Sequence, residues 1–194
     1  MSNWTASDFI ASDVVLDFLN TVGDQDKARA QEKLITWDHA VSWAQYAGLV
    51  SDMEGDQLKL AAEHQKSLKR LWEFREATFS LISPIVQGTE VSAATIERIE
   101  NCVQQAVSAS RLSKTGRARE IPAVNAGAEL IHHRLALHLF GFLSSPDMSK
   151  IRECKRCSWL FIDRGRGNGR IWCKMTSCGN RAKAERFRAD RQPS

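Results

Sequence analysis

The stretch that decides how this chain is read is CKRC at residues 154–157, followed after fifteen residues by CKMTSC at residues 173–178. Four of the five cysteines of the 194-residue sequence lie here, as two closely spaced pairs. A tetrahedral zinc ion needs four soft ligands at about 2.3 Å, and two short cysteine pairs can supply them. The sequence therefore predicts one structural zinc ion held by Cys154, Cys157, Cys173 and Cys178.

Four cysteines have three other common uses, and zinc is favoured over each of them. Two disulfides would need an oxidising compartment. A redox CxxC motif uses one pair and usually follows a strand in a thioredoxin-like βαβ unit. An iron–sulfur cluster remains compatible with the number of ligands.

The residues around the cysteines predict a small treble-clef-like module of knuckle, hairpin and helix. Residues 159–162 and 170–172 are rich in strand formers and flank a glycine-rich turn, so they predict a hairpin. A helix is expected over residues 180–191, with Ala184 and Phe187 packed on the hairpin. Without the metal, so small a module buries too little surface to fold.

Charge is distributed unevenly along the chain. Residues 150–194 hold thirteen basic and four acidic side chains, a net charge of +9, whereas residues 1–149 hold fourteen basic and nineteen acidic side chains, a net charge of −5. A basic end on an acidic body is typical of nucleic-acid contact confined to that end. A basic tail that docks on its own acidic body is the alternative.

The basic end predicts contact with duplex DNA, through arginines that grip phosphates or read guanine edges. RNA binding, or a protein-interaction adaptor of the transcription machinery, are the alternatives, because four cysteine ligands do not distinguish these partners. The expected contacts are Arg181, Lys183, Arg186 and Arg188, followed by Arg166 and Arg170.

Upstream of residue 144 the apolar residues recur at helical spacing, and this predicts an all-α bundle. Helices are expected over residues 13–22, 36–48, 51–83 in one or two pieces ending before Pro84, from residue 92, and over 125–144. Residues 144–149 are the expected linker. The predicted domains are therefore residues 1–146, all-α, and residues 150–191, the finger.

Arg75 lies on the apolar face of its predicted helix, where a guanidinium needs acidic partners or a polar pocket. A structural ion pair with Asp17 or Glu129 is one interpretation. The other is an effector pocket lined by Arg75 and Asn20. Elsewhere in the body, Cys102 and His138 are expected to be buried core residues. The adjacent His132 and His133 point about 100° apart, so they cannot form an i, i+4 ligand pair with each other.

The sequence also predicts a cytoplasmic protein that is not an enzyme. It has no basic segment followed by an apolar run at the start, and its longest apolar run is too short to span a bilayer. No nucleophile and base fall on one helical face, and four thiolates would fill the zinc shell. A homodimer through a helical face of the body is left open.

At these residues the sequence resembles a known family. CGNR at residues 178–181, with Phe161, Asp163, Trp172 and Lys183, is similar to the CGNR zinc-finger domain. The body, with LDFLNT at residues 16–21 and LWEFR at residues 71–75, resembles the helical ABATE domain. This resemblance implies a bacterial stress-induced transcription regulator with one zinc ion.

Overall fold

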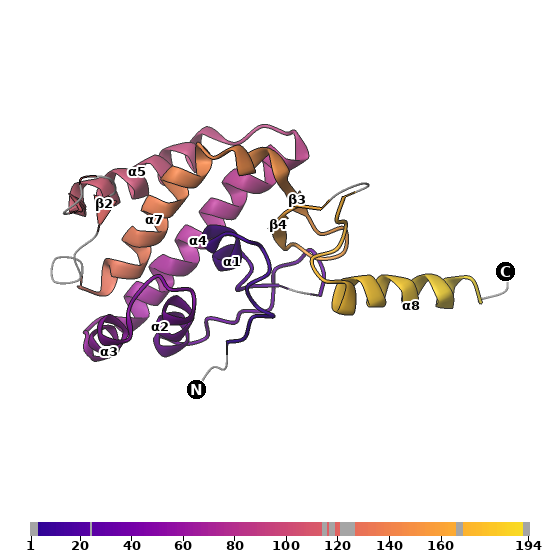
Figure 1. Ribbon diagram of the computed structural model, residues 1–194, viewed down its shortest axis with the longest axis horizontal. Coiled ribbons are helices and arrows are strands. Elements are labelled where there is room, and N and C mark those ends of the chain that lie inside the picture. Colours follow the sequence, from indigo (N-terminus) through magenta and orange to yellow (C-terminus); the bar gives the residue numbers. More distant parts are fainter. Residues whose placement is uncertain are drawn as a thin grey trace.

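The computed structural model describes residues 4–23, 25–113, 116, 119–120, 127–165 and 169–191. The body is a bundle of helices around the long helix α4, and the finger sits at one end of it (Figure 1). The body helices are α1 (Val14–Leu19), α2 (Trp37–Tyr46), α3 (Asp52–Leu60), α4 (His64–Gln87), α5 (Ala93–Ala109) and α7 (Leu130–Leu143).

Hydroxyl and carboxylate side chains fix where the first body helices begin. The Thr36 hydroxyl accepts a hydrogen bond from the backbone N–H of His39, and Asp13 caps α1 in the same way. Ser51 and Glu54 form a complete capping box at α3. These side chains replace the partners that the first turn of a helix lacks. The predicted helix starts at residues 36 and 51 are confirmed.

The predicted helix over residues 51–83 forms two pieces, α3 and α4. Its expected end before Pro84 is wrong, because α4 continues to Gln87 with Pro84 inside it. Proline there removes one backbone hydrogen bond and crowds the carbonyl of Ser80. The buried contacts of Leu81, Ile82 and Ser83 hold this turn in the helix despite that cost. Gly88 then ends α4 with φ +70°, a conformation that glycine adopts without steric cost.

The core forms where α1, α2, α4 and α7 meet. Phe18 and Trp43 are both buried, with ring centroids 5.4 Å apart, and Leu135 of α7 is fully buried. His138, expected in the core, is exposed instead, and Leu139 takes the buried position. The rest of the apolar stripe expected on α7, Ile131, Leu135 and Phe142, is buried.

Two short antiparallel ladders interrupt the helices. In the body, β1 (Arg111–Leu112) pairs with β2 (Arg119–Glu120), where the sequence suggested a loop or short hairpin. In the finger, the 3₁₀ helix η2 (Pro146–Lys150) occupies the expected linker and leads into β3 (Ile151–Glu153), which pairs with β4 (Leu160–Ile162). The expected pairing of residues 159–162 with residues 170–172 is therefore wrong. The finger hairpin instead encloses the first cysteine pair.

The finger and the body share one hydrophobic core. Ile151, Trp159 and Phe161 of the finger belong to the same buried cluster as Leu16 and Phe18 of α1. In addition, the backbone N–H of Ile162 donates to the Ala11 carbonyl at 3.0 Å. The finger hairpin is therefore held rigidly against the body. Among the described residues, no helix has both the length and the apolar character that crossing a membrane requires.

The last helix extends away from this packed unit. A π-helical turn, η3 (Met175–Gly179), leads into α8 (Asn180–Ala189), which projects from the finger (Figure 1). No residue of α8 is buried, and the Phe187 side chain is 57% exposed. The expectation that Phe187 packs on the hairpin is wrong, because α8 points away from that hairpin. Instead, the Arg191 guanidinium lies 4.4 Å from the centroid of the Phe187 ring.

Candidate metal centre and nucleic-acid interface

The four predicted ligands meet in one buried cluster. Cys154 and Cys157 lie in the turn between β3 and β4, while Cys173 and Cys178 come from the segment that leads into α8. All four sulfur atoms lie within 4.8 Å of one another, and all four side chains are buried. The Sγ atoms of Cys157 and Cys173 are 3.6 Å apart, too far for a disulfide bond, and all the cysteines are free.

This donor set fits zinc. Four sulfurs at about 2.3 Å from a tetrahedral ion lie about 3.8 Å from each other, close to the separation of Cys157 and Cys173. Hydrogen bonds from Cys157 and Cys173 already hold the pKa of the Cys154 thiol well below its usual range. A zinc ion bound here would have a full ligand shell, so its chemistry is structural: it would tie β3, β4 and α8 together.

Gly179 allows the close turn between the last ligand and α8. A Cβ atom at this position would lie 2.5 Å from Sδ of Met175 and 3.2 Å from the Trp172 ring. Cys178, immediately before it, lies in the π-helical turn η3. Cys178, which belongs to the metal cluster, therefore fixes the position of the N-terminal end of α8.

Residues 20–23 and 25–29 of the body lie against the finger knuckle. The Ser158 N–H donates to the Asp26 carbonyl at 3.1 Å. The Lys27 ammonium donates to the Cys154 carbonyl at 2.6 Å and pairs with the Glu153 carboxylate. We call these residues the clasp.

Gly23 of the clasp, whose φ is +63°, lies next to the finger. A Cβ atom there would lie 2.8 Å from the Arg29 Cα and 3.1 Å from Oγ of Ser158. Arg156, within the knuckle, donates to the Gln25 carbonyl. No pattern in the sequence indicates this contact, because residues 23–27 are a short polar segment without a recognisable motif.

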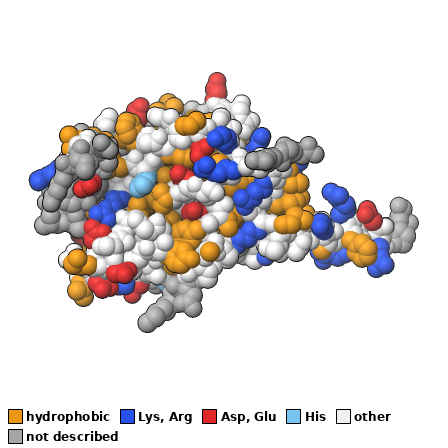
Figure 2. All heavy atoms as spheres, viewed as in Figure 1, with side chains coloured by type: hydrophobic (Ala, Val, Ile, Leu, Met, Phe, Trp, Pro, Cys, Tyr) orange, Lys and Arg blue, Asp and Glu red, His pale blue; other side chains and the backbone are white. Residues whose placement is uncertain are grey.

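The first-choice nucleic-acid contacts all lie on α8. Figure 2 shows basic side chains distributed along this projecting helix. In the described part of the chain, neither Lys183 nor Arg186 has a protein partner, and both are exposed. The Nε of Arg188 donates only to the Ala184 carbonyl of its own helix. Arg181 lies in the first turn of α8 and is half-buried.

The two second-choice contacts have different outcomes. Arg170 is engaged inside the finger: its Nε donates to the Trp172 carbonyl at 2.9 Å, and its guanidinium lies 4.2 Å from the Phe161 ring centroid. It also donates to the carbonyls of Cys173 and Ile10. Arg170 therefore braces the finger instead of facing a partner, and we withdraw it as a contact. Arg166 lies outside the described residues.

Arg75 is bound by protein groups. Its Nη1 and Nη2 donate to the two carboxylate oxygens of Glu32 at 2.8 and 2.5 Å. Its Nε donates to Glu76 at 2.9 Å, and Nη1 also donates to the Thr21 hydroxyl at 3.0 Å. The expected partners Asp17 and Glu129 are wrong, but the structural interpretation of Arg75 is supported.

Asn20 is likewise bound by protein groups, through the backbone of Leu160 in the finger. The two residues expected to line an effector pocket thus stabilise the clasp and its junction with the finger.

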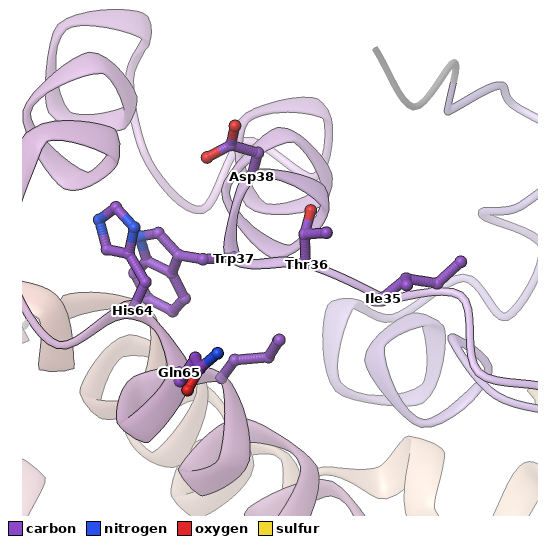
Figure 3. Close-up of a pocket in the computed structure, with 7 residues that line it drawn as sticks. Ile35, Thr36, Trp37, Asp38, His64 and Gln65 are labelled. Atoms are coloured by element: carbon purple, nitrogen blue, oxygen red, sulfur yellow. The ribbon is translucent and has the colours of Figure 1, made fainter.

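A separate cavity of about 330 Å³ opens where the starts of α2 and α4 meet. The His64 ring lies beside Trp37 in it, with centroids 6.0 Å apart, and the Asp38 carboxylate stands at its edge (Figure 3). The cavity is lined by Ile35, Thr36, Trp37, Asp38, His64, Gln65 and Leu68.

Comparison with protein families gives two matches. Residues 12–146 match the ABATE family model, described as "Putative stress-induced transcription regulator", and residues 150–191 match the CGNR zinc finger. The finger match contains the whole four-cysteine cluster. No curated protein matches the sequence.

Proposed function

The chain belongs to the ABATE family, and we propose that it regulates transcription by binding duplex DNA through its zinc finger. The observation that carries this proposal is the projecting helix α8. It is basic, has no buried residue, and begins two residues after Cys178 of the metal cluster. A helix without a packing partner gains little from the rest of the fold, so an external partner accounts for its exposure.

The spacing of the cations suits a helix lying in a groove. Successive residues turn by about 100° around a helix. Arg181 and Arg188 therefore form one row, while Lys183 and Arg186 form a second row on roughly the opposite side. In a major groove about 12 Å wide, the two rows would face the two flanking phosphate backbones. This arrangement favours phosphate contacts as the main source of affinity.

Other parts of the chain restrict how DNA can approach. The body carries a net charge of −5 and the C-terminal residues +9, so the field of the molecule favours approach from the finger end. On α8 itself, Glu185 pairs with Arg156 of the knuckle. This pair would fix the rotation of α8 about its own axis relative to the zinc centre.

We further propose that the helical body changes DNA affinity when it binds an effector or a protein partner. The clasp supports this, because it connects α1 and α4 directly to the finger knuckle. The cavity at Trp37 and His64 is where a small effector would bind, in place of the expected site at Arg75 and Asn20. A second copy of the chain, docked through the body, would lengthen the DNA footprint.

A catalytic role is not part of the proposal. Four thiolates leave the zinc ion no open position for a substrate or a water molecule. We place the protein in the cytoplasm, where reduced thiols are available for zinc.

The test is recovery of randomised duplex DNA by the zinc-loaded full chain, compared with a variant carrying Arg181→Ala, Arg186→Ala and Arg188→Ala. Enrichment of a motif that the triple variant loses is the expected result, and a palindromic motif would indicate a dimer. A matched control replaces three exposed basic residues of the body, Lys66, Lys69 and Arg98, with alanine. This control should recover the same motif as the wild type.

Two outcomes would reject DNA as the partner. Preference for folded or single-stranded RNA under matched salt would identify an RNA-binding zinc protein. No recovery of either nucleic acid at moderate salt would favour a protein-interaction adaptor.

A further inference from the structure

A second group of metal-ligating side chains lies at the start of α7, away from the finger. Glu129 directly precedes this helix. His132 and His133 lie in its first turn, three and four residues after Glu129. Residues at these two spacings lie on the same helical face as the first. One carboxylate oxygen and one nitrogen from each ring lie within 4.8 Å of one another. Glu129 thus lies close to both of the adjacent histidines.

Both histidines bury a nitrogen that has no partner. The Nδ1 atoms of His132 and His133 are inaccessible to solvent, and no described residue forms a hydrogen bond with either. The His132 side chain is 92% buried (8% exposed) and packs edge-on against Phe74. Buried polar atoms in folded proteins are nearly always satisfied. The two Nδ1 atoms, buried without hydrogen-bond partners, are therefore available to bind a ligand.

Arg70 holds the Glu129 carboxylate in a suitable orientation. Its Nη1 lies 2.9 Å from Oε1 of Glu129, while Oε2 faces His132 Nδ1 at 4.0 Å. Carboxylates that bind metal ions are usually held in place by a hydrogen bond of this kind. The Arg70 side chain is 46% exposed, so water screens its charge from a bound cation.

We propose that Glu129, His132 and His133 bind a divalent first-row transition metal ion, such as Zn²⁺, at a second site independent of the finger. Two imidazoles and one carboxylate suit such ions, whereas Mg²⁺ and Ca²⁺ prefer oxygen ligands. Neighbouring ligand atoms of a tetrahedral zinc site lie about 3.4 Å apart, so the widest pair here closes by no more than about 1.4 Å. Three protein ligands leave room for water, and the Glu129 side chain is 25% exposed.

The test is titration of Zn²⁺ into the full chain already holding one zinc equivalent in its finger, followed by calorimetry. We expect one further equivalent to bind the wild type. Glu129→Gln and His132→Phe, which preserve shape and the packing on Phe74, should each weaken this step at least tenfold. His138→Ala removes an exposed histidine from the same helix and should leave it unchanged.

A second readout separates the two sites. Co²⁺ added to the zinc-loaded protein should give the weak visible bands of nitrogen and oxygen ligands, without the thiolate charge-transfer band of the finger. Circular dichroism checks that each variant is folded, and the half-buried His133→Asn replaces His132→Phe if that variant unfolds. The proposal is overturned if the wild type binds no further equivalent, or if Glu129→Gln and the histidine variant bind it as tightly as His138→Ala does.

Discussion

The side chain of Asn20 forms two hydrogen bonds with the backbone of Leu160, 140 residues further along the chain. The Leu160 N–H donates to Oδ1 of Asn20 at 3.0 Å, and Nδ2 of Asn20 donates to the Leu160 carbonyl at 2.8 Å. Leu160 lies in β4, whose other edge pairs with β3. The amide of Asn20 therefore serves as a neighbouring strand for the open edge of the finger hairpin.

Asn20→Ala should destabilise the protein by about 2 kcal/mol, because it leaves a buried N–H and a buried carbonyl of Leu160 without partners. Urea unfolding of the zinc-loaded chain measures this change. Asn101→Ala, at an exposed position of α5, should change the free energy of unfolding by less than about 0.5 kcal/mol. Equal effects of the two substitutions would contradict the role assigned to Asn20.

Arg75→Met should lower the free energy of unfolding by about 3 kcal/mol, since it leaves Glu32 without its bidentate partner inside the fold. Thermal unfolding detects the loss. Arg98→Met provides the control, because Arg98 pairs with Glu73 at the surface, where ion pairs contribute about 0–1 kcal/mol. A normally stable Arg75→Met protein would instead revive the effector-pocket interpretation.

Removing zinc should unfold the finger while the helices of the body persist. A chelator, or Cys178→Ser, should expose the backbone of residues 150–191 to rapid hydrogen exchange, because the metal holds the two cysteine-bearing segments of the finger together. Cys102→Ser removes the cysteine outside the cluster and should keep the zinc. Unchanged protection of residues 150–191 after chelation would contradict a structural metal.

Acid should weaken the contact between α3 and α7. Two hydrogen bonds from Arg134, at 2.9 and 2.6 Å, lower the pKa of Glu54 to about 2. A carboxylate whose pKa is lowered by folding stabilises the protein above its unfolded value, about 4.5, and loses that contribution as the pH falls towards 2.

Glu54→Gln should therefore lower stability at pH 6 and flatten its dependence on pH between 5 and 3, as measured by urea unfolding across that range. Glu97→Gln alters an exposed carboxylate of α5 and provides the comparison. If both variants follow the wild-type pH profile, the pair between Glu54 and Arg134 does not contribute to acid stability.

Local signals in the sequence were sufficient to predict most body helices and the metal cluster. Cap residues such as Thr36 and Ser51 act within one turn of their helices, and the spacing of the cysteines is itself the signal for zinc. The end of α4 was missed because the tertiary contacts of this helix outweigh the local cost of Pro84, and sequence alone does not reveal those contacts.

Contacts between distant segments were not accessible to sequence reasoning. The strand of residues 160–162 could pair with either flanking segment, and hydrophobic pattern alone does not choose between them. Arg170 resembled the other cations of the basic end, and only its position above Phe161 reveals that it braces the finger. The clasp and the pairing of Asn20 with Leu160 depend on how distant segments pack together.

The central claim is that α8 contacts the phosphates of duplex DNA, and the most direct measurement is fluorescence anisotropy of a labelled duplex titrated with zinc-loaded protein at increasing salt. The wild type should show a steep linear fall of log K with log salt concentration. The variant with Arg181→Ala, Arg186→Ala and Arg188→Ala should bind more weakly, with a slope reduced by about 0.9 for each phosphate contact removed. Identical affinity and slope for the wild type and the triple variant would contradict the account.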